Sequence, residues 1–415
     1  MSIVAWTTAL LLAGAIGIQL VLVLLYRQAL LTAISDSPDR SFQPPAAVIL
    51  CLRGADPSLP RCLAALADQD YAGYQVVCVL DHGDDPAGQV IGHSGYLDHP
   101  RFRVLTAGQP GGQCSLKCNA LVTALDQLDP AVEVVALVDA DCEVDRQWLA
   151  DLVAPLVDRQ VAVATGNRWF SPERSNPGTL VRYLWHMAAA VQMYVYRIPW
   201  GGSLAFRREL VEEAGLKDRW ASCLFEDTML GPVARQLGRR VVVIPGLLVP
   251  NRESIGLKQA RVWIRRQLLN MRLYHPAFPL AVGHCLGTAS VLLATTVLGL
   301  QACWNGDGLT LAVMAAGGVL YVAFYAASLV MLRRAAAQVL QHRHQEVEPP
   351  LPGFGLAGAV ALTQVVYCLA MLGAFRNRIR WRGIDYRIEG PARISLSGYR
   401  PIEPVVSEAA RSIEQ

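Results

Sequence analysis

Long uncharged stretches alternate with segments of mixed character along the chain. Residues 3–26 carry no charge before Arg27 and are long enough to span a bilayer. Residues 278–303 and 308–332 are also apolar, and the polar turn at 305–308 between them predicts a transmembrane hairpin. A last apolar stretch, 354–375, precedes a run of arginines (Arg376, Arg378, Arg380 and Arg382). This pattern predicts an integral, multi-pass membrane protein.

Between these stretches, short β-rich runs alternate with helical segments. The runs are Ala46–Leu52, Gln75–Leu80, Phe102–Leu105, Glu133–Val138, Val161–Thr165 and Arg240–Ile244. Such alternation predicts a mostly parallel α/β sheet covered by helices on both faces. We expect a transmembrane helix at 1–30, a linker at 31–45, the α/β domain at 46–256, an interfacial amphipathic helix at 257–276, membrane-embedded helices at 277–375 and a basic tail at 376–415.

Basic residues at the ends of the apolar stretches indicate the orientation. Arg27 places the α/β domain in the cytosol, and the hairpin returns the chain there at Arg333-Arg334. If 354–375 also crossed the bilayer, the arginines after it would lie outside, against the positive-inside rule. The sequence leaves open whether that segment crosses or is re-entrant.

Composition supports a membrane protein and excludes some functions. The chain is 53% hydrophobic and 17% charged, which is too apolar for an ordinary soluble enzyme. The formal charge of +3 and the lack of a basic stripe with interleaved aromatic residues give no reason to expect nucleic acid. The 10 cysteines have no zinc-finger spacing, and we interpret the globular domain as reduced.

The most informative motif is Asp139-Ala140-Asp141, at the end of the apolar run 134–138. In open α/β sheets, ligands bind at the carboxyl ends of the strands. In an extended segment, residues two apart point the same way. Paired carboxylates can hold a hard divalent cation, which can in turn clamp a diphosphate. Taken alone, the tripeptide also fits a solvated strand end.

Several motifs appear in a fixed order along the chain. After the 52–87 segment with Asp81 and Asp85 come Lys117-Cys-Asn119-Ala-Leu121, Asp139-Ala-Asp141, Trp200-Gly-Gly-Ser-Leu-Ala-Phe206, Phe225-Glu226-Asp227, a Gln-Trp helix at 259–263, and Trp381-Arg-Gly-Ile-Asp-Tyr386-Arg. Together they resemble the ceramide glucosyltransferases and their bacterial relatives, inverting membrane glycosyltransferases with a GT-A nucleotide-sugar domain. The resemblance covers most of the chain.

The resemblance implies roles for the acidic motifs. Asp141 is expected to coordinate Mg²⁺ or Mn²⁺, with Asp139 facing the ribose or the metal, and a bound cation would neutralise the leaving diphosphate. Asp227 is expected to be the general base that accepts the proton of an acceptor alcohol. Without the resemblance, Glu226-Asp227 would also fit a favourable start to a helix.

Other residues are expected to bind the nucleotide-sugar. Asp81 and Asp85 are candidates for a uracil edge or ribose, although an acidic turn before Pro86 is the simpler alternative. Lys117 is expected to offset diphosphate charge, and Gly202 lies in a Gly-Gly-Ser segment where the backbone can approach the sugar closely.

The helix at 257–274 departs from the family pattern Gln-x-x-Arg-Trp. Gln259 and Trp263 keep their spacing, but Val262 replaces the arginine, and Arg261 lies one position early. At about 100° per residue, Arg261 points about 160° away from Trp263, whereas Arg266 lies about 60° from it. We therefore expect Gln259, Trp263 and Arg266 to face the donor, and the opposite face (Lys258, Arg261, Arg265 and Arg272) to meet solvent or anionic lipid. An ordinary interfacial helix is the alternative.

The sequence thus predicts a glycosyltransferase that moves a hexose, with glucose from UDP-glucose preferred, onto a membrane lipid hydroxyl such as that of ceramide or diacylglycerol. A processive polysaccharide synthase is the rival enzyme, and few spans for a polymer channel count against it. A catalytically inactive scaffold is the rival from another class, and the presence of both Asp141 and Asp227 argues against it.

Overall fold

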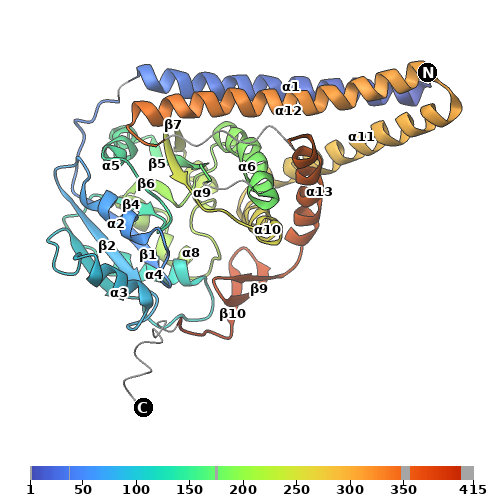
Figure 1. Ribbon diagram of the computed structural model, residues 1–415. Coiled ribbons are helices and arrows are strands. Elements are labelled where there is room, and N and C mark those ends of the chain that lie inside the picture. Colours follow the sequence, from blue (N-terminus) through green and yellow to red (C-terminus); the bar gives the residue numbers. More distant parts are fainter. Residues whose placement is uncertain (1, 37, 173–175, 347–355, 403–415) are drawn as a thin grey trace, which may run out of the picture. The chain divides into compact units, whose positions relative to one another are not determined.

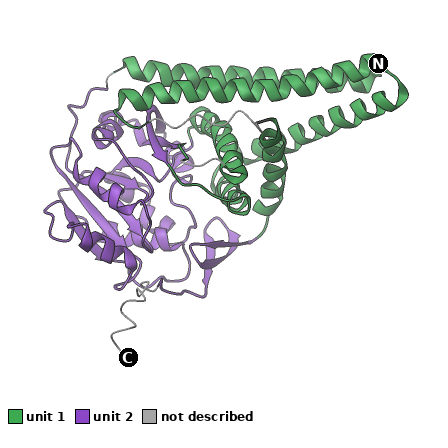
Figure 2. Ribbon diagram, in the orientation of Figure 1, with its two compact units in different colours: residues 1–37, 170–197, 252–376 green, residues 38–169, 198–251, 377–415 purple. Residues whose placement is uncertain are grey.

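The computed structural model describes residues 2–36, 38–172, 176–346 and 356–402, and its contacts divide the chain into two compact units (Figure 2). The helical unit comprises Met1–Ser37, Phe170–Arg197 and Arg252–Arg376. The sheet unit comprises Pro38–Trp169, Ile198–Asn251 and Asn377–Gln415. Position 37 of the predicted linker, residues 354–355 of the last apolar stretch and 403–415 of the predicted tail lie outside the described residues.

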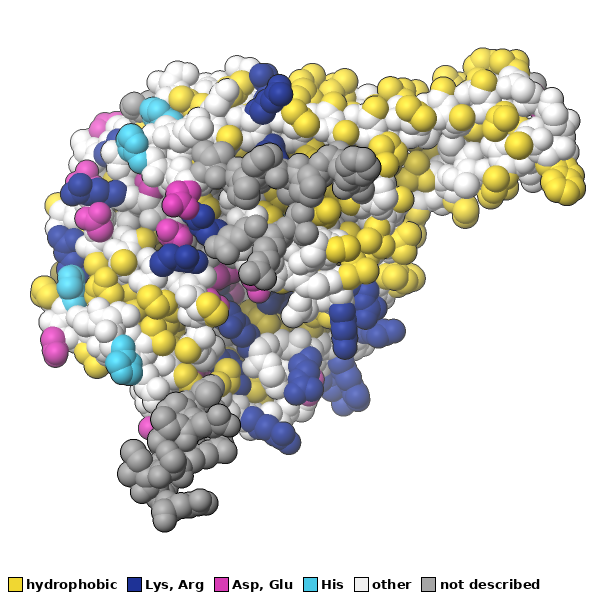
Figure 3. Space-filling model, in the orientation of Figure 1, with side chains coloured by type: hydrophobic (Ala, Val, Ile, Leu, Met, Phe, Trp, Pro, Cys, Tyr) yellow, Lys and Arg dark blue, Asp and Glu magenta, His cyan; other side chains and the backbone are white. Residues whose placement is uncertain are grey.

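Long apolar helices make up most of the helical unit. Among the described residues, 4 are long and apolar enough to cross a membrane: α1 (Ile3–Ser35), α11 (Phe278–Asn305), α12 (Gly308–His342) and α13 (Leu356–Ala374). α1 and α12 lie side by side along their length (Figure 1). Many of their large apolar side chains are exposed, as Figure 3 shows for this face. Exposed apolar surface of this extent fits contact with lipid rather than water, so the chain is a membrane protein, as predicted.

Two further helices of this unit pack against α13. They are α6 (Pro177–Tyr196) and α10 (Leu257–Tyr274), which also contact each other. Val181 of α6, Ile264 and Leu268 of α10, and Met371 of α13 share one buried cluster. α6 and α10 approach closely because Gly178 has no side chain: a Cβ there would overlap the backbone of Gly256 and Leu257.

The main sheet of the sheet unit has 7 strands in the order β3-β2-β1-β4-β6-β5-β7. β3, β2, β1 and β4 run parallel, and β6 is antiparallel to both β4 and β5. The strands are β1 (Ala46–Leu52), β2 (Tyr74–Leu80), β3 (Phe102–Thr106), β4 (Val134–Val138), β5 (Val161–Phe170), β6 (Ser203–Arg207) and β7 (Arg240–Asn251). β1, β2 and β4 are almost entirely buried, as expected for strands covered on both faces.

Helices cover the sheet on both faces. Successive side chains of β1 point to opposite faces, and their contacts identify the helices on each face. Val48 and Leu50 face a cluster with Leu63 of α2 and Leu149 of α5. Cys51 points to the opposite face, where its thiol donates to the Lys117 carbonyl of α4. The helices and the 3-10 turn of this unit are α2 (Leu59–Ala67), α3 (Pro86–His93), α4 (Leu116–Asp126), α5 (Trp148–Val153), η1 (Ala154–Val157), α7 (Glu209–Glu213), α8 (Leu216–Trp220) and α9 (Leu230–Gln236).

A second, antiparallel sheet of 3 strands follows α13: β8 (Arg378–Trp381), β9 (Ile384–Gly390) and β10 (Arg393–Ser397). Ile379, Ile384, Tyr386, Ile388 and Ile394 are buried while their neighbours are more exposed. The range predicted as a basic tail is therefore folded up to Ser397. Its arginines alternate with apolar residues at the period of a strand, so the same residues that predicted a basic tail also fit a β-strand.

The predicted mostly parallel α/β sheet and the membrane-length helices are confirmed. The division into units differs from the predicted ranges in two ways. Residues 170–197 and 252–256 belong to the helical unit because α6 packs on α10 and α13, and residues 377–402 belong to the sheet unit.

Candidate functional site

Two carboxylates follow β4 at the carboxyl edge of the sheet, and one guanidinium meets both. Arg168 Nη2 lies 3.3 Å from Asp139 Oδ2 and 3.6 Å from Asp141 Oδ2. Asn251 at the end of β7 donates to Asp141 Oδ2 at 2.8 Å. The guanidinium of Arg168 also stacks over the Trp200 ring, 4.8 Å from its centroid. Two carboxylates therefore converge on one cationic group.

Lys117 links this pair to another carboxylate. It lies in the first turn of α4, and its Nζ is 2.6 Å from both Asp139 Oδ1 and Glu226 Oε1. Burial disfavours the charged amine, but the two carboxylates outweigh it and hold the pKa of Lys117 well above its usual range. Burial raises the pKa of Glu226, and Lys117 opposes that shift. The structure thus places Lys117 between two carboxylates, while its predicted contact with a diphosphate stays a prediction.

The Gly201-Gly202 turn brings Asp227 next to Asp139. The N–H of Gly201 donates to Asp227 Oδ2 at 3.0 Å, and that of Thr228 donates to Asp227 Oδ1 at 2.6 Å. A Cβ on Gly202 would overlap the Trp200 ring and lie 2.8 Å from Asp139 Oδ2. A Cβ on Gly201 would overlap Glu226 Oε1. Both glycines therefore allow the carboxylates to approach the backbone closely.

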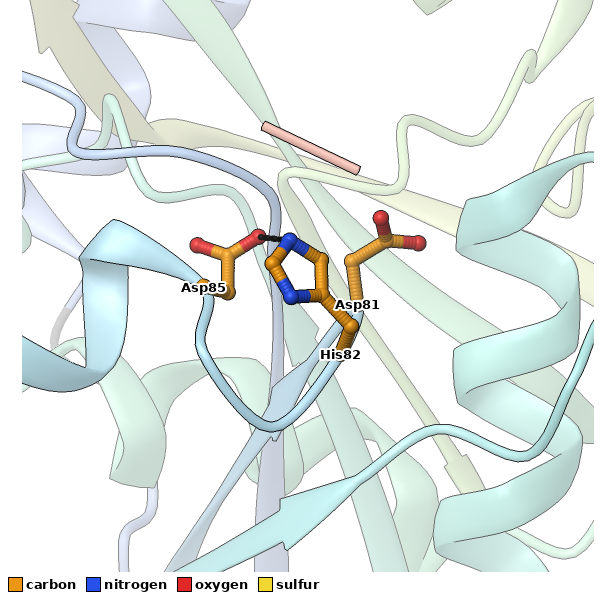
Figure 4. A group of neighbouring side chains, drawn as sticks. All are labelled: Asp81, His82 and Asp85. Carbon is orange, nitrogen blue, oxygen red and sulfur yellow. Dashed lines mark ion pairs between the residues drawn. The ribbon is translucent and has the colours of Figure 1, made fainter. Parts of the chain in front are cut away.

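Asp81 and Asp85 lie in the loop after β2, at the same edge of the sheet (Figure 4). Arg53 Nη1 pairs with Asp81 Oδ2, and the Tyr399 hydroxyl donates to the same oxygen at 3.0 Å. Asp85 is the N-cap of α3, and its Oδ1 accepts from the N–H groups of Ala87 and Gly54 at 2.9 and 2.8 Å. Burial raises the pKa of Asp81, while Arg53 and Tyr399 oppose the shift.

Among the described residues, two groups of side chains have donors that suit a divalent cation. The first is Asp139 and Asp141, predicted from the sequence. The second is Asp81, His82 and Asp85, whose ligand atoms lie within 4.8 Å of one another and which the sequence analysis did not consider. In the second group Arg53 already neutralises Asp81. Lys117 and Arg168 neutralise the first group in the same way, so the difference is exposure: the oxygens of Asp139 and Asp141 are partly exposed and more accessible to a hard cation.

The remaining predicted residues lie on α10 in the helical unit. Gln259 Oε1 accepts from the Gly256 N–H at 2.7 Å, so this side chain caps its own helix. Trp263 packs edge-on against Phe170 and Trp185, with ring centroids 5.4 and 5.7 Å apart. Arg266 is half-buried, while Arg261 is exposed. On the predicted lipid-facing side, Arg265 Nε donates to the Gly373 carbonyl at 2.9 Å, so part of that face packs on α13.

Several residues around these carboxylates were not predicted as site residues from the sequence: Arg53, Arg168, Glu226, Asn251 and Tyr399. Arg53 could have been predicted as a site residue, because it directly follows β1 at the carboxyl edge of a parallel sheet. Asn251 and Arg168 lie near the ends of long strands that the β-rich runs did not reach. No local sequence pattern could connect Tyr399 with Asp81, since the two residues are 318 positions apart.

Similar proteins include two curated relatives. An N-acetylglucosaminyltransferase of Bradyrhizobium elkanii is 30% identical over 122 residues, which are 29% of this chain and 63% of that protein. Another, from Mesorhizobium japonicum, is 28% identical over 148 residues, 34% of each chain. The chain thus spans less than two thirds of these relatives.

Solved structures with a similar fold are more distant in sequence. The mannosyltransferase PcManGT from Pyrobaculum calidifontis, solved with GDP-Man and Mn²⁺, is 19% identical with a TM-score of 0.46, covering 87% of this chain and 99% of that one. Glucosyl-3-phosphoglycerate synthase from Mycobacterium tuberculosis, solved with Mn²⁺, UDP and glucosyl-3-phosphoglycerate, is 16% identical with a TM-score of 0.36, covering 58% and 82%.

The sequence family covers nearly the whole chain. Residues 7–394 match glycosyl transferase family 21, so that most of the described sheet unit and of the membrane-length helices falls within the match. The chain therefore belongs to glycosyl transferase family 21.

Proposed function

We propose that this protein transfers a hexose from a UDP-sugar to the hydroxyl of a membrane lipid, with inversion at the anomeric carbon. The observation that carries the proposal is the Gly201-Gly202 turn: the Gly201 N–H donates to Asp227, and Gly202 lies against Asp139. A base and an acidic donor-binding group are thus adjacent at the carboxyl edge of one sheet. Glucose remains the preferred sugar, and ceramide and diacylglycerol the first lipids to try.

Asp227 has the geometry of a general base. The N–H groups of Gly201 and Thr228 fix the orientation of its carboxylate, which can still accept a proton from an acceptor alcohol. As the alcohol oxygen bonds to the anomeric carbon, its proton passes to Asp227, and the bond from that carbon to the diphosphate oxygen breaks with its electron pair leaving on the UDP. One displacement without a covalent intermediate inverts the configuration.

Asp139 and Asp141 would hold a divalent cation, and the match of oxygen ligands to Mg²⁺ or Mn²⁺ supports this assignment. When bound, such a cation supplies Lewis-acid stabilisation of the leaving diphosphate. Asn251 and Arg168 keep the Asp141 carboxylate oriented. Lys117 ties Asp139 to Glu226, which directly precedes the proposed base.

The helices support a lipid acceptor. A lipid cannot leave the bilayer without exposing its chains to water, so an enzyme that modifies it gains from being embedded beside it. Among the described residues, the membrane-length helices α1, α11, α12 and α13 provide that placement. We propose that the sheet unit faces the cytosol, in line with the basic residues after the first stretch and the hairpin.

The test is transfer by the purified protein in lipid nanodiscs. UDP-glucose and UDP-N-acetylglucosamine, the latter because of the names of the two relatives, are offered with ceramide or diacylglycerol. We expect a glycolipid from the unaltered protein and a loss of about 10²–10⁴-fold in Asp227→Asn, with UDP binding retained. A mutant that keeps more than about a tenth of the activity would contradict the role of Asp227. Absence of product with every lipid, alongside polymer release, would favour the polysaccharide synthase.

A further inference from the structure

The C-terminal segment 377–402 contacts the same edge of the sheet where the acidic loops lie. The Tyr386 hydroxyl accepts a hydrogen bond from the Leu116 N–H at the start of α4, at 3.3 Å. The Leu396 N–H donates to the Gly112 carbonyl at 2.8 Å, which fixes β10 to the loop that precedes α4. The segment is thus an integral part of the sheet unit.

An aromatic contact joins the same segment to the loop of the proposed base. The Trp381 ring lies 5.7 Å from that of Phe225, between centroids. Phe225 directly precedes Glu226 and Asp227 in the chain. The segment therefore contacts both the start of α4, which carries Lys117, and the loop that carries Asp227.

The centre of this contact region is the pair Arg53 and Asp81. Arg53 donates to the carbonyls of Arg382 and Arg400 at 3.1 and 2.7 Å, and it pairs with Asp81 Oδ2. The Tyr399 hydroxyl donates to the same carboxylate oxygen at 3.0 Å. The Arg53 and Asp81 side chains are only 9% and 5% exposed, so their ion pair is largely shielded from water and correspondingly stronger.

The arrangement leaves the other oxygen of Asp81 for a ligand. Both chain donors bind Oδ2, and Oδ1 has no hydrogen-bond partner among the described residues. A carboxylate oxygen accepts from N–H or O–H donors, which a nucleoside offers on its base and its ribose. Because two donors bind the same oxygen, the Asp81 carboxylate cannot rotate freely to find such a donor and is oriented in advance.

We propose that Tyr399 and Arg53 are positioning residues that orient Asp81 for the nucleoside of the donor, so that the C-terminal segment completes the donor site. The inference rests on the proposed function, because it takes Asp81 to be a nucleoside contact. The segment after α13 would then take part in donor binding. Neither the sequence motifs nor the proposed chemistry assigns it that role.

The test compares two substitutions that each remove a single hydroxyl from this segment. Tyr399→Phe removes the donor to Asp81, and Tyr386→Phe removes the partner of the Leu116 N–H as a matched control. Affinity for UDP and for inorganic pyrophosphate is measured by calorimetry on the full-length protein in nanodiscs, together with donor KM and kcat. Thermal unfolding of each variant establishes that it is folded.

We expect Tyr399→Phe to weaken UDP binding and raise donor KM about tenfold, the size of a lost hydrogen bond to a charged group, with kcat and pyrophosphate affinity unchanged. Tyr386→Phe should leave UDP affinity unchanged. Two results would show that the segment acts only through the fold and would overturn the proposal. One is an equal loss of UDP affinity in the two variants, and the other is a loss of pyrophosphate affinity in Tyr399→Phe as large as its loss of UDP affinity. Tighter UDP binding in Tyr399→Phe would also overturn it, because Tyr399 would then compete with the nucleoside.

The outcomes separate this inference from the proposed function. If the unaltered protein binds UDP but forms no glycolipid, the lipid acceptor is wrong, while the UDP affinities still decide the role of Tyr399. If glycolipid forms and Tyr399→Phe binds UDP as the unaltered protein does, the proposed function stands and the role of Tyr399 is wrong. If the unaltered protein does not bind UDP, both are wrong.

Discussion

The carboxylates after β4 and those after β2 lie at the same edge of one sheet but differ in exposure and partners. The side chains of Asp139 and Asp141 are 26% and 28% exposed, and their nearest partners include the cations Lys117 and Arg168. Those of Asp81 and Asp85 are 5% and 0% exposed, and they accept hydrogen bonds from Arg53, Tyr399 and backbone N–H groups.

The difference indicates two kinds of use for the same residue type. Partly exposed carboxylates beside cationic side chains can exchange one positive partner for another, which suits a metal or a charged reaction centre. Buried carboxylates held by donors of the chain keep one orientation, which suits recognition of a neutral group such as a nucleoside. Burial distinguishes the two loops more than residue type or charge does, because Asp81 also pairs with a cation, Arg53.

The largest expected effect comes from removing one carboxylate from each loop in turn. Asp141→Ala should lower transfer and Mn²⁺ affinity by more than the roughly 10–100-fold that loss of a group supporting a metal ligand costs. Asp81→Ala should weaken UDP binding and leave Mn²⁺ affinity intact. Calorimetric titration of each variant with Mn²⁺ and with UDP checks this. If Asp81→Ala were the variant that lost Mn²⁺, the cation would belong to the loop after β2 and the comparison would be reversed.

A smaller effect is expected where the backbone meets the carboxylates. Gly201→Ala should destabilise the protein by about 1–3 kcal/mol, because its Cβ would overlap the Glu226 carboxylate, which Lys117 holds in place. Gly83→Ala is the control, since a Cβ there meets nothing within 4 Å. Thermal unfolding of both variants is the measurement. Equal melting temperatures would mean that Glu226 moves aside easily and that the turn is not closely packed.

The diphosphate has no assigned arginine in either loop, and Arg266 is the predicted candidate. We expect Arg266→Ala to raise donor KM up to about tenfold, since a guanidinium can form two hydrogen bonds to phosphate oxygens. Arg261→Ala is the matched control and should act mainly on salt-sensitive membrane association. Donor KM of the two variants is compared at fixed ionic strength. A larger change at Arg261 would show that the opposite face of α10 meets the donor.

The smallest expected effect is on the pH dependence of stability at Glu226. Burial raises its pKa, and Lys117 only partly offsets the shift. Folding therefore favours the protonated carboxyl, so its contribution to stability is present below the ordinary carboxyl pKa and is lost as pH rises through the raised value. In Glu226→Gln this decline should disappear from the melting temperature measured against pH. If Glu226→Gln kept the pH profile of the unaltered protein, the contact with Lys117 would outweigh the effect of burial on the Glu226 carboxyl.

Much of the fold could be predicted because strands such as β1 and β4 are short apolar runs with clear ends. β6 was missed because it lies directly after the glycine turn, and β8 was missed because its arginines were attributed to a membrane flank. Asp81, Asp139 and Asp141 could be predicted because they follow strand ends, whereas Asp227 was predicted only from the resemblance. Their partners Arg168 and Tyr399 come from distant parts of the chain, and such pairings depend on the fold rather than on any local pattern.

The second sheet also constrains how many times the chain crosses the bilayer. β8–β10 fold with the strands that precede α10, yet α11, α12 and α13 lie between them in sequence. Both parts of one folded unit must be on the same side of a membrane, so the number of complete crossings among these helices is even. In α13, 50% of the apolar window is buried in protein, compared with 22% in α11 and 28% in α12.

We therefore infer that α13 enters the bilayer without crossing it, and that the chain crosses the membrane with α1, α11 and α12. The arginines after α13 then lie on the same side as Arg27 and Arg333, which removes the conflict with the positive-inside rule. A topology reporter fused after residue 415 should report the side opposite to one inserted at the 305–308 turn. The same side for both reporters would mean that α13 does cross.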